Sequence, residues 1–466
     1  MEDNKPQKHY GLFTAICMVV GIVIGSGVFF KAQDILNYTN GNMMLGIFAW
    51  LIGGAVMILC ALAFANLATK YAKVNGIVDY AEAIVGEKYA YFTGWFISTI
   101  YFPAMTSVLA WVSARYTLIL FNPDADITGG LCMALGTLYL CLSYAVNVLS
   151  PRIAGKFQVG TTVIKLLPLA AIVLVGISVG LAKGNTQEAF ASASQLSDTT
   201  FSDVFAGITA SAFAYEGWII ATSINAELKE PKKNLPIALA VGTAIIMAVY
   251  ILYFIGLTGG ASVDVLRTEG APAAFRNLFG KPGGSLFNAF IIISCLGTLN
   301  GLMLACTRSL YSISVRGHGP APLVFSQLDP HTNMPTNSAV LALLFCGIWY
   351  FYFYASNLTT PVFGLFSFDS SELPIITIYA IYIPILVLFI KKEGKKNPTR
   401  NILLPLLAIL ASLFMVVAAI YAHGIRPYLV AAERGQFAFP VLFYLIVFAI
   451  IMGLGGIWYK NKGNRL

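Results

Sequence analysis

An apolar run near the amino terminus is interrupted by Gly21-Ile-Val-Ile-Gly25-Ser26-Gly27-Val28-Phe29. A glycine inside a helix costs about 1 kcal/mol relative to alanine, and this stretch holds several of them within two turns. Small residues at every fourth position also allow two membrane helices to pack closely. The stretch by itself is therefore compatible with close packing or with an unwound helix that lines a cavity.

A second interruption of the same kind follows at Ser211-Ala-Phe213-Ala214-Tyr215-Glu216-Gly217-Trp218. Counted from the amino terminus, the first interruption falls in predicted helix 1 and the second in predicted helix 6. Interrupted helices at corresponding positions of two halves indicate a binding site near the middle of the membrane. The second interruption therefore favours the unwound interpretation for both.

The composition of the whole chain is that of an integral membrane protein. Of 466 residues, 58% are apolar and 11% are charged, with a mean hydropathy of +0.76. These values exclude a soluble enzyme and a disordered protein, and a spanning helix needs about 20 apolar residues. We predict an all-α protein, one domain over residues 1–466, with about twelve membrane helices. Their predicted ranges are 10–33, 43–69, 89–121, 129–149, 157–181, 203–225, 236–259, 284–315, 336–355, 361–390, 402–423 and 438–459.

The distribution of positive charge predicts the orientation in the membrane. Twenty of the 29 Lys and Arg residues fall in segments on the same side as both termini, and eight fall on the other side. Cytoplasmic loops carry the excess of Lys and Arg. We therefore expect a multi-pass protein of the cell membrane with cytoplasmic termini. The net charge of +8 reflects this rule and not binding to nucleic acid.

Cysteines and histidines give no sign of a metal site, a cofactor or an enzyme. The seven cysteines lie in or beside apolar stretches and form no CxxC pair. The four histidines include no HExxH motif, and none is predicted in the middle of the membrane. An enzyme is therefore the weakest of the functional hypotheses.

An unwound stretch at residues 25–27 would expose backbone N–H groups at the start of a half-helix, an end that carries partial positive charge. Such an end suits a carboxylate, and Ser26 adds a hydroxyl donor. The preceding half-helices end in carbonyls near Val23, Phe213 and Glu216, which suit an ammonium group. Together these groups predict a clamp for a zwitterion.

Several stretches resemble the amino acid–polyamine–organocation superfamily, and within it the L-type amino acid transporters and their bacterial relatives. They are GIVIGSGVFF from Gly21, TTVIKLLPL from Thr161, AFAYEGWIIATSINAELKEPKKNLPIAL from Ala212 and CLGTLNGLMLACTRSLYSISVRGHGP from Cys295. The resemblance implies two inverted five-helix repeats, at about 10–181 and 203–390, with helices 1 and 6 discontinuous. Peripheral helices at about 402–459 would complete the fold.

The resemblance also implies roles for single residues in substrate binding. The substrate carboxylate would lie on the backbone of Gly25, Ser26 and Gly27, and its amine on the carbonyls of Val23, Phe213 and Glu216. Phe213 is either an aromatic gate or a packing residue. The remaining candidates for the substrate site are Ala214 within the second interruption, and Tyr215, Asn300 and Thr106 as lining for the substrate side chain.

Lys165 lies about eight residues into predicted helix 5, where a lysine is costly unless it is paired or hydrated. The resemblance places it where sodium-coupled relatives hold sodium, bridging the Gly21 carbonyl to Ser294. This implies transport that does not depend on sodium. Lys165 could alternatively carry a proton, and the sequence leaves both roles open.

The predicted function is therefore an antiporter that exchanges neutral, small L-amino acids by alternating access. The alternatives are a proton-coupled symporter that uses Lys165, and a carrier of cationic amino acids or amines. Asp369 and Glu372, predicted in the outer half of helix 10, could attract a cationic substrate or simply lie near water. The loop FNPDADITGG lacks a cysteine and Cys132 is expected within helix 4, so we expect no heavy-chain subunit.

Overall fold

The computed structural model describes residues 11–71, 76–122, 125–193, 201–222, 228–358 and 360–460. Within these ranges, ten helices are long and apolar enough to cross a membrane. The pair Leu12–Val23 (α1) and Gly27–Tyr38 (α2), bent by 54° at its break, passes the same test together. The prediction of an all-α integral membrane protein is confirmed.

The helices form because a chain in lipid must satisfy its backbone hydrogen bonds internally. Helix α3 (Met43–Lys70) shows how the sequence sets the ends of one span. The Asn42 side chain accepts a hydrogen bond from the Leu45 N–H at 3.1 Å and caps its start, and Lys70 lies in its last turn. At 1.5 Å per residue the helix is about 42 Å long, enough to cross a bilayer core of about 30 Å.

The chain divides into two compact units, each built from three separate segments. Unit 1 consists of residues 1–90, 173–268 and 376–418. Besides α1, α2 and α3 it includes α4 (Ile77–Ile84), α10 (Ile177–Lys183), α11 (Asn185–Ala193), α12 (Phe201–Tyr215), α13 (Trp218–Ala221), α14 (Pro231–Leu257), α15 (Val263–Thr268), η5 (Gly394–Lys396), η6 (Thr399–Leu403) and most of α19 (Leu373–Glu393) and α20 (Leu404–Ile420).

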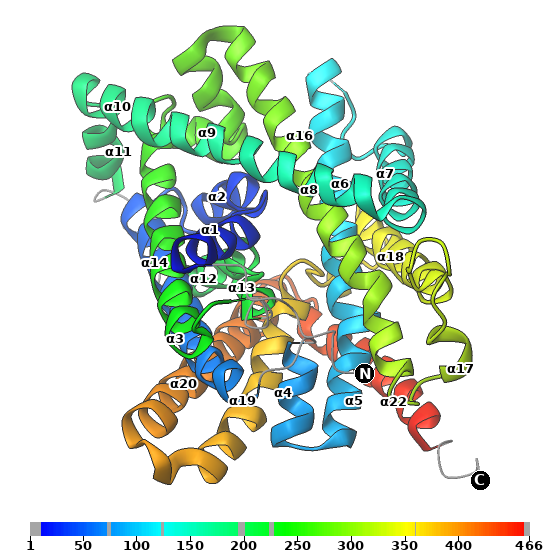
Figure 1. The fold of residues 1–466 in the computed structure, drawn as a ribbon. Helices are drawn as coiled ribbons and strands as arrows, with labels where there is room; N and C mark the ends of the chain where they lie inside the picture. Colours follow the sequence, from blue (N-terminus) through cyan, green and yellow to red (C-terminus); the bar gives the residue numbers. More distant parts are fainter. Residues whose placement is uncertain are drawn as a thin grey trace. The chain divides into compact units, whose positions relative to one another are not determined.

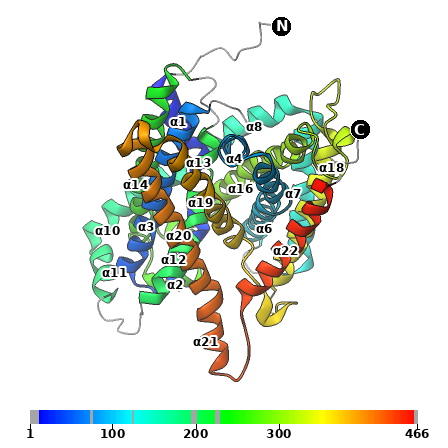
Figure 2. The same cartoon turned by 90° about the horizontal axis from the view of Figure 1, so that it is seen from below.

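Within unit 1, α14 packs on α1 and α3, and α12 packs on α2 and α3 (Figure 1). Figure 2 shows α3, α12 and α14 side by side from below. Trp50 of α3 is the centre of an aromatic cluster, with ring centroids 5.6 Å from Tyr215, 5.5 Å from Tyr250 and 6.4 Å from Phe254. This cluster fixes α12 and α14 against α3 and so positions the second interruption.

Unit 2 consists of residues 91–172, 269–375 and 419–466. Its long helix α16 packs on α6, α7, α8 and α18. Its elements are most of α5 (Glu87–Phe96), η1 (Ile97–Tyr101), α6 (Phe102–Phe121), α7 (Gly130–Leu149), α8 (Pro151–Ile164), α9 (Leu166–Ala171), α16 (Ala271–Ser314), α17 (Pro322–Phe325), α18 (Thr336–Ser356), η4 (Gly364–Phe366), η7 (Tyr421–Ile425), α21 (Arg426–Ala432) and α22 (Pro440–Lys460). The short π-helix η2 (Ile172–Gly176) lies where the chain passes from unit 2 to unit 1.

One predicted helix start was wrong, and another agrees with a kink in the chain. Predicted helix 10 begins at Leu373 and not at residue 361, because the Asp369 carboxylate accepts hydrogen bonds from the N–H groups of Ser371 and Glu372 and forms a turn before the helix. Predicted helix 8, from residue 284, corresponds to the part of α16 that follows Gly280, and a further helical part, from Ala271, precedes it. Gly280, with φ 77° and ψ 177°, divides α16 into these two helical parts.

The end of predicted helix 11 and the length of helix 6 also differ. Helix 11 continues through the π-turn η7 to Ala432, and does not end at residue 423. Helix 6 consists of α12 and α13, of fifteen and four residues, which are too short to pass as spans singly. Part of its predicted carboxyl end, residues 223–227, lies outside the described residues, so the count of twelve spans stays a prediction.

Candidate functional site

The first interruption is a true break in the helix. Helix α1 ends at Val23, Ile24 is extended with φ −63° and ψ 102°, and α2 starts at Gly27. Ser26 is only 1% exposed, and its hydroxyl has no hydrogen-bond partner among the described residues. The described chain also gives no acceptor to the backbone N–H groups of Ser26 and Gly27. These donors lie at the positive end of α2, so the break can bind an anion.

The second interruption is a break closed by a glycine in a left-handed conformation. Helix α12 ends at Tyr215, Gly217 has φ 109° and ψ −16°, and α13 starts at Trp218. An L-residue with a side chain pays roughly 1–2 kcal/mol in the left-handed region, which explains a glycine here. The Phe213 carbonyl accepts a long hydrogen bond of 3.4 Å from the Glu216 N–H. The turn thus leaves this carbonyl weakly bonded at the end of α12.

The two breaks lie directly against each other within unit 1. A Cβ added to Gly27 would stand 2.9 Å from the Ala214 Cα and 3.0 Å from the Phe213 ring. A Cβ added to Gly217 would stand 3.4 Å from the Ile22 carbonyl oxygen. Figure 1 shows α1, α2, α12 and α13 gathered in the same part of this unit. Donors from one break and carbonyls from the other are therefore within reach of one small molecule.

Tyr250 of α14 joins the two breaks and was missed by the sequence analysis. Its buried hydroxyl lies 3.0 Å from the Ala214 carbonyl oxygen and 3.3 Å from that of Val23. A carbonyl oxygen has two lone pairs, so the Val23 carbonyl can still accept from an ammonium group. Nothing in the sequence distinguishes this tyrosine from its 22 others.

The aromatic residues of the second break point in different directions. The Phe213 ring packs on Phe30, with centroids 5.4 Å apart, and lies 5.8 Å from the Lys31 ammonium. The Tyr215 hydroxyl donates to the Trp50 carbonyl at 2.9 Å. Phe213 thus lies beside Gly27 at the first break, whereas Tyr215 contributes to packing against α3. Glu216 is buried, close enough to Tyr379 and Tyr382 to interact electrostatically with both.

Lys165 and Ser294 belong to unit 2 and lie at matching levels of two packed helices. Gln158 and Thr161 of α8 contact the positions of Gly301 and Gly297 in α16, which is an antiparallel register. One turn further along α8, the same register pairs Lys165 with Ser294. Both are buried, with Lys165 only 4% exposed, but the Ser294 hydroxyl has no hydrogen-bond partner among the described residues, so the structure does not show the predicted bridge between them.

The helix is interrupted at Lys165 itself, between α8 and α9. Pro168 has no N–H to donate to the carbonyl four residues earlier, and its ring crowds that carbonyl, which explains the interruption. Gly21 belongs to unit 1, so the predicted bridge from Lys165 to its carbonyl stays a prediction.

Two residues proposed for the side-chain pocket hold helices of unit 2 together. Asn300 donates to the Ala154 carbonyl at 3.2 Å and accepts from Asn147 at 3.0 Å, so it links α16 to α7 and α8. Thr106 is fully buried, with its hydroxyl 2.7 Å from the Phe102 carbonyl and 3.4 Å from the Cys306 sulfur. These contacts favour a packing role for Asn300 over a place in the substrate pocket.

The two acidic residues of predicted helix 10 have structural partners. Asp369 caps the turn before α19, and Glu372 is fully buried, 3.0 Å from the His423 ring. His423 lies inside the extended helix 11 and not at its predicted end. These contacts give both carboxylates a structural role.

An all-helical membrane chain with two broken helices facing each other belongs to the class of secondary transporters. A family model described as amino acid permease matches residues 10–456, and the chain belongs to this family. The chain is 30% identical to the serine/threonine exchanger SteT of Bacillus subtilis, over 89% of this chain and 92% of that protein. It is 26% identical to the mouse b(0,+)-type amino acid transporter 1, over 92% and 86%. It is 25% identical to the human cystine/glutamate transporter, over 72% and 68%.

Proposed function

We propose that this amino acid permease exchanges neutral, small L-amino acids across the cell membrane without sodium. The observation that carries the proposal is the pair of facing breaks, with the buried Ser26 hydroxyl and the N–H groups of Ser26 and Gly27 open to an acceptor. A relative named as a serine/threonine exchanger supports small neutral substrates.

In this proposal the two breaks together bind the carboxylate and the ammonium group of one amino acid. The backbone of Gly25, Ser26 and Gly27 binds the carboxylate, and the carbonyls of Val23, Phe213 and Glu216 bind the ammonium group. The adjacent Phe213 ring acts as a gate. An empty clamp leaves buried donors and acceptors unpaired, at about 1–3 kcal/mol each, which slows the return of the empty carrier. Exchange is the expected outcome.

The division into units supports alternating access between two inverted repeats. Unit 1 takes helices 1 and 2 of the first proposed repeat and helices 6 and 7 of the second. Unit 2 takes most of the later helices of each repeat. We propose that unit 1 rocks against unit 2 while it carries the amino acid.

Lys165 supports independence from sodium in this proposal. A fixed ammonium group between α8 and α16 would occupy the place where sodium-coupled relatives of the superfamily hold their ion. Cys132 is buried in α7, and the loop before it has no cysteine, so we also propose that the chain works without a disulfide-linked heavy chain. The distribution of Lys and Arg supports cytoplasmic termini in this proposal.

The test is counterflow in proteoliposomes that contain the purified chain. Vesicles loaded with unlabelled L-serine should take up labelled L-serine, with or without sodium, and empty vesicles should take up little. A panel of the twenty amino acids, each added outside as a competitor, then ranks the substrates. Uptake into empty vesicles driven by a pH gradient would instead favour the proton-coupled alternative. Strongest competition by arginine and lysine would favour the cationic alternative.

A further inference from the structure

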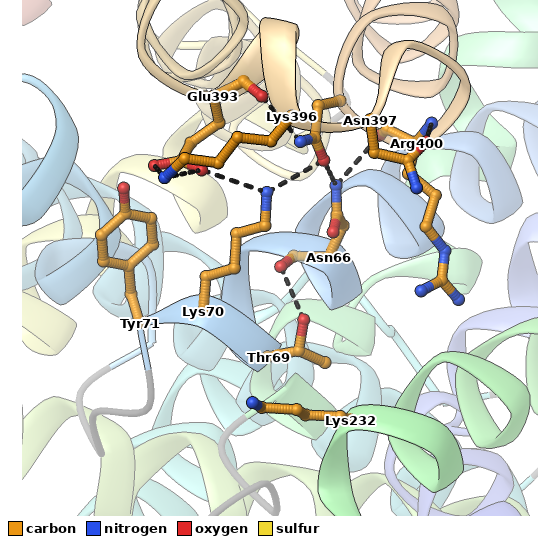
Figure 3. Close-up of a pocket in the computed structure, with 10 residues that line it drawn as sticks. Asn66, Thr69, Lys70, Tyr71, Lys232, Glu393, Lys396, Asn397 and Arg400 are labelled. Atoms are coloured by element: carbon orange, nitrogen blue, oxygen red, sulfur yellow. Dashed lines mark hydrogen bonds and ion pairs between the residues drawn. The ribbon is translucent and has the colours of Figure 1, made fainter.

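A polar cavity of about 580 Å³ opens in unit 1 where α3 and α19 end (Figure 3). It takes residues from three places: the last turn of α3, the connection from α19 to α20, and the first turn of α14. The lining residues are Asn66, Thr69, Lys70, Tyr71, Lys232, Glu393, Lys396, Asn397, Arg400 and Asn401. We call this cavity the basic pocket.

The basic pocket has more positive charge than its own residues neutralise. Lys70, Lys232, Lys396 and Arg400 carry four positive charges, and Glu393 is the one carboxylate in the lining. Glu393 is shared, at 3.5 Å from the Lys70 ammonium and 3.1 Å from that of Lys396. In the described part of the chain, Lys232 and Arg400 have no carboxylate within ion-pair distance. The pocket therefore attracts anions.

Hydrogen bonds hold one wall of the basic pocket in place. The Asn401 side chain donates to the Glu393 carbonyl at 2.7 Å and accepts from Lys70 at 2.9 Å. Asn66 donates to the Arg400 carbonyl at 2.9 Å, as Figure 3 shows. A wall that is already ordered loses less entropy when it binds a ligand.

Tyr71 adds a neutral donor at the edge of the pocket. Burial, and then the nearby Glu393 carboxylate, raise the pKa of its phenol above the ordinary value. The hydroxyl therefore keeps its proton at neutral pH and can donate to an anion.

The first turn of α14 supplies an independent argument for a bound anion. Lys232 and Lys233 lie there, at the positive end of a long helix, and this turn has no acidic residue. A cation at this end is unfavourable, because the exposed N–H groups of the first turn carry partial positive charge. An anion between α14 and the opposite wall would be favoured by the helix end and by Lys232 together.

We propose that the basic pocket binds a phosphate-bearing anion, supplied either by the head group of an anionic membrane lipid or by a free phosphate compound. Phosphate matches an arginine fork together with several lysines better than a singly charged carboxylate does. The pocket lies at the ends of two spans, the level at which basic pockets bind anionic head groups. This site is separate from the facing breaks, and its test does not depend on the proposed transport function.

A bound anion would tie α14 to α3 and to the connection between α19 and α20. Helix α14 also carries Tyr250, which contacts both breaks. Occupancy of the basic pocket should therefore stabilise unit 1 against thermal unfolding.

The test compares two double variants with the same loss of charge. Lys232→Gln/Arg400→Gln removes the two lining cations that have no carboxylate partner. Lys391→Gln/Lys395→Gln removes two exposed lysines that are close in sequence to lining residues but outside the lining. All four side chains are exposed, so both variants should fold, which size-exclusion chromatography and the melting temperature without added anion would check.

The first arm measures lipid binding. Each protein is reconstituted with equal amounts of phosphatidylcholine and phosphatidylglycerol, extracted, and its retained phosphatidylglycerol is counted by native mass spectrometry. At about 1 kcal/mol for each lysine or arginine, the pocket variant should bind about 30-fold more weakly than the wild type, and the control should match the wild type. The second arm titrates delipidated protein with inorganic phosphate and follows the melting temperature.

The two arms distinguish the source of the anion. Loss of phosphatidylglycerol in the pocket variant alone supports a lipid head group. A rise in melting temperature with phosphate, present in the control and absent in the pocket variant, supports a soluble phosphate compound. Equal behaviour of the two variants in both arms, or no binding by the wild type, would overturn the proposal.

Discussion

Gly27 is the residue at which the two breaks come closest. Its missing side chain leaves room for the Ala214 backbone, and a backbone atom cannot turn aside as a flexible side chain can. Gly27→Ala should push the breaks apart at a cost of about 1–3 kcal/mol and reduce counterflow by at least about tenfold. Gly160→Ala is the matched control, because that position in α8 opens to free space. Equal counterflow in both variants would contradict this account of Gly27.

Tyr250 gives a finer test, because it can lose one oxygen without losing its ring. Tyr250→Phe removes the hydroxyl that contacts the Val23 and Ala214 carbonyls. The expected loss is about 1–3 kcal/mol, seen as a lower melting temperature and a higher KM for exchange. Tyr89→Phe removes a similar bond to the Ile381 carbonyl, away from the breaks. It should lower stability while leaving KM unchanged, and a raised KM there would count against a specific role for Tyr250.

Lys165 distinguishes a fixed cation from a proton carrier. As a fixed cation it is needed for all transport, so Lys165→Ala should slow counterflow about tenfold or more, with normal amounts of protein in the membrane. Lys183→Ala, at the exposed end of the same span, should be neutral. Normal counterflow in Lys165→Ala, combined with loss of pH-driven uptake, would mean that the lysine carries a proton.

At the scale of elements, the break in helix 6 depends on the conformation of Gly217. Gly217→Ala forces an L-residue into the left-handed region, at roughly 1–2 kcal/mol, in a turn that contacts Ile22. Thermal unfolding should show this loss, and exchange should fall with it. Gly347→Ala, in the open interior of α18, should gain up to about 1 kcal/mol from helix propensity. If both variants behaved alike, the turn would not need its glycine.

Hydropathy predicted the elements better than their ends. The interior of α3 is a continuous apolar run, and its predicted and observed ends agree within one residue. The start of α19 is set instead by hydrogen bonds of the Asp369 carboxylate, which an apolar window does not register. The carboxyl end of helix 11 continues through a π-turn past His423, a residue that a hydropathy window counts as polar. The buried contact with Glu372 explains why that polar residue lies inside a helix.

At the scale of the whole molecule, the sequence indicated both breaks but not what holds them. Gly27 and Gly217 stand out in the sequence as glycines within apolar segments. Gly27 allows the close approach of the Ala214 backbone, and Gly217 adopts a left-handed conformation. Tyr250 could not be predicted, because its role comes from the packing of α14 on α1 and α3. Asn300 shows the reverse case, since a polar residue in an apolar helix can serve to join helices and not to bind a substrate.

Amide hydrogen exchange can show whether the broken ends of helices 1 and 6 hold an amino acid. The measurement follows the backbone N–H groups of Ser26 and Gly27 in reconstituted protein, with and without saturating L-serine. We expect slower exchange at these two amides when serine is bound, and no change at exposed amides in the loop near Asp329. Unchanged exchange at Ser26 and Gly27, in vesicles that show serine counterflow, would contradict the proposed binding site.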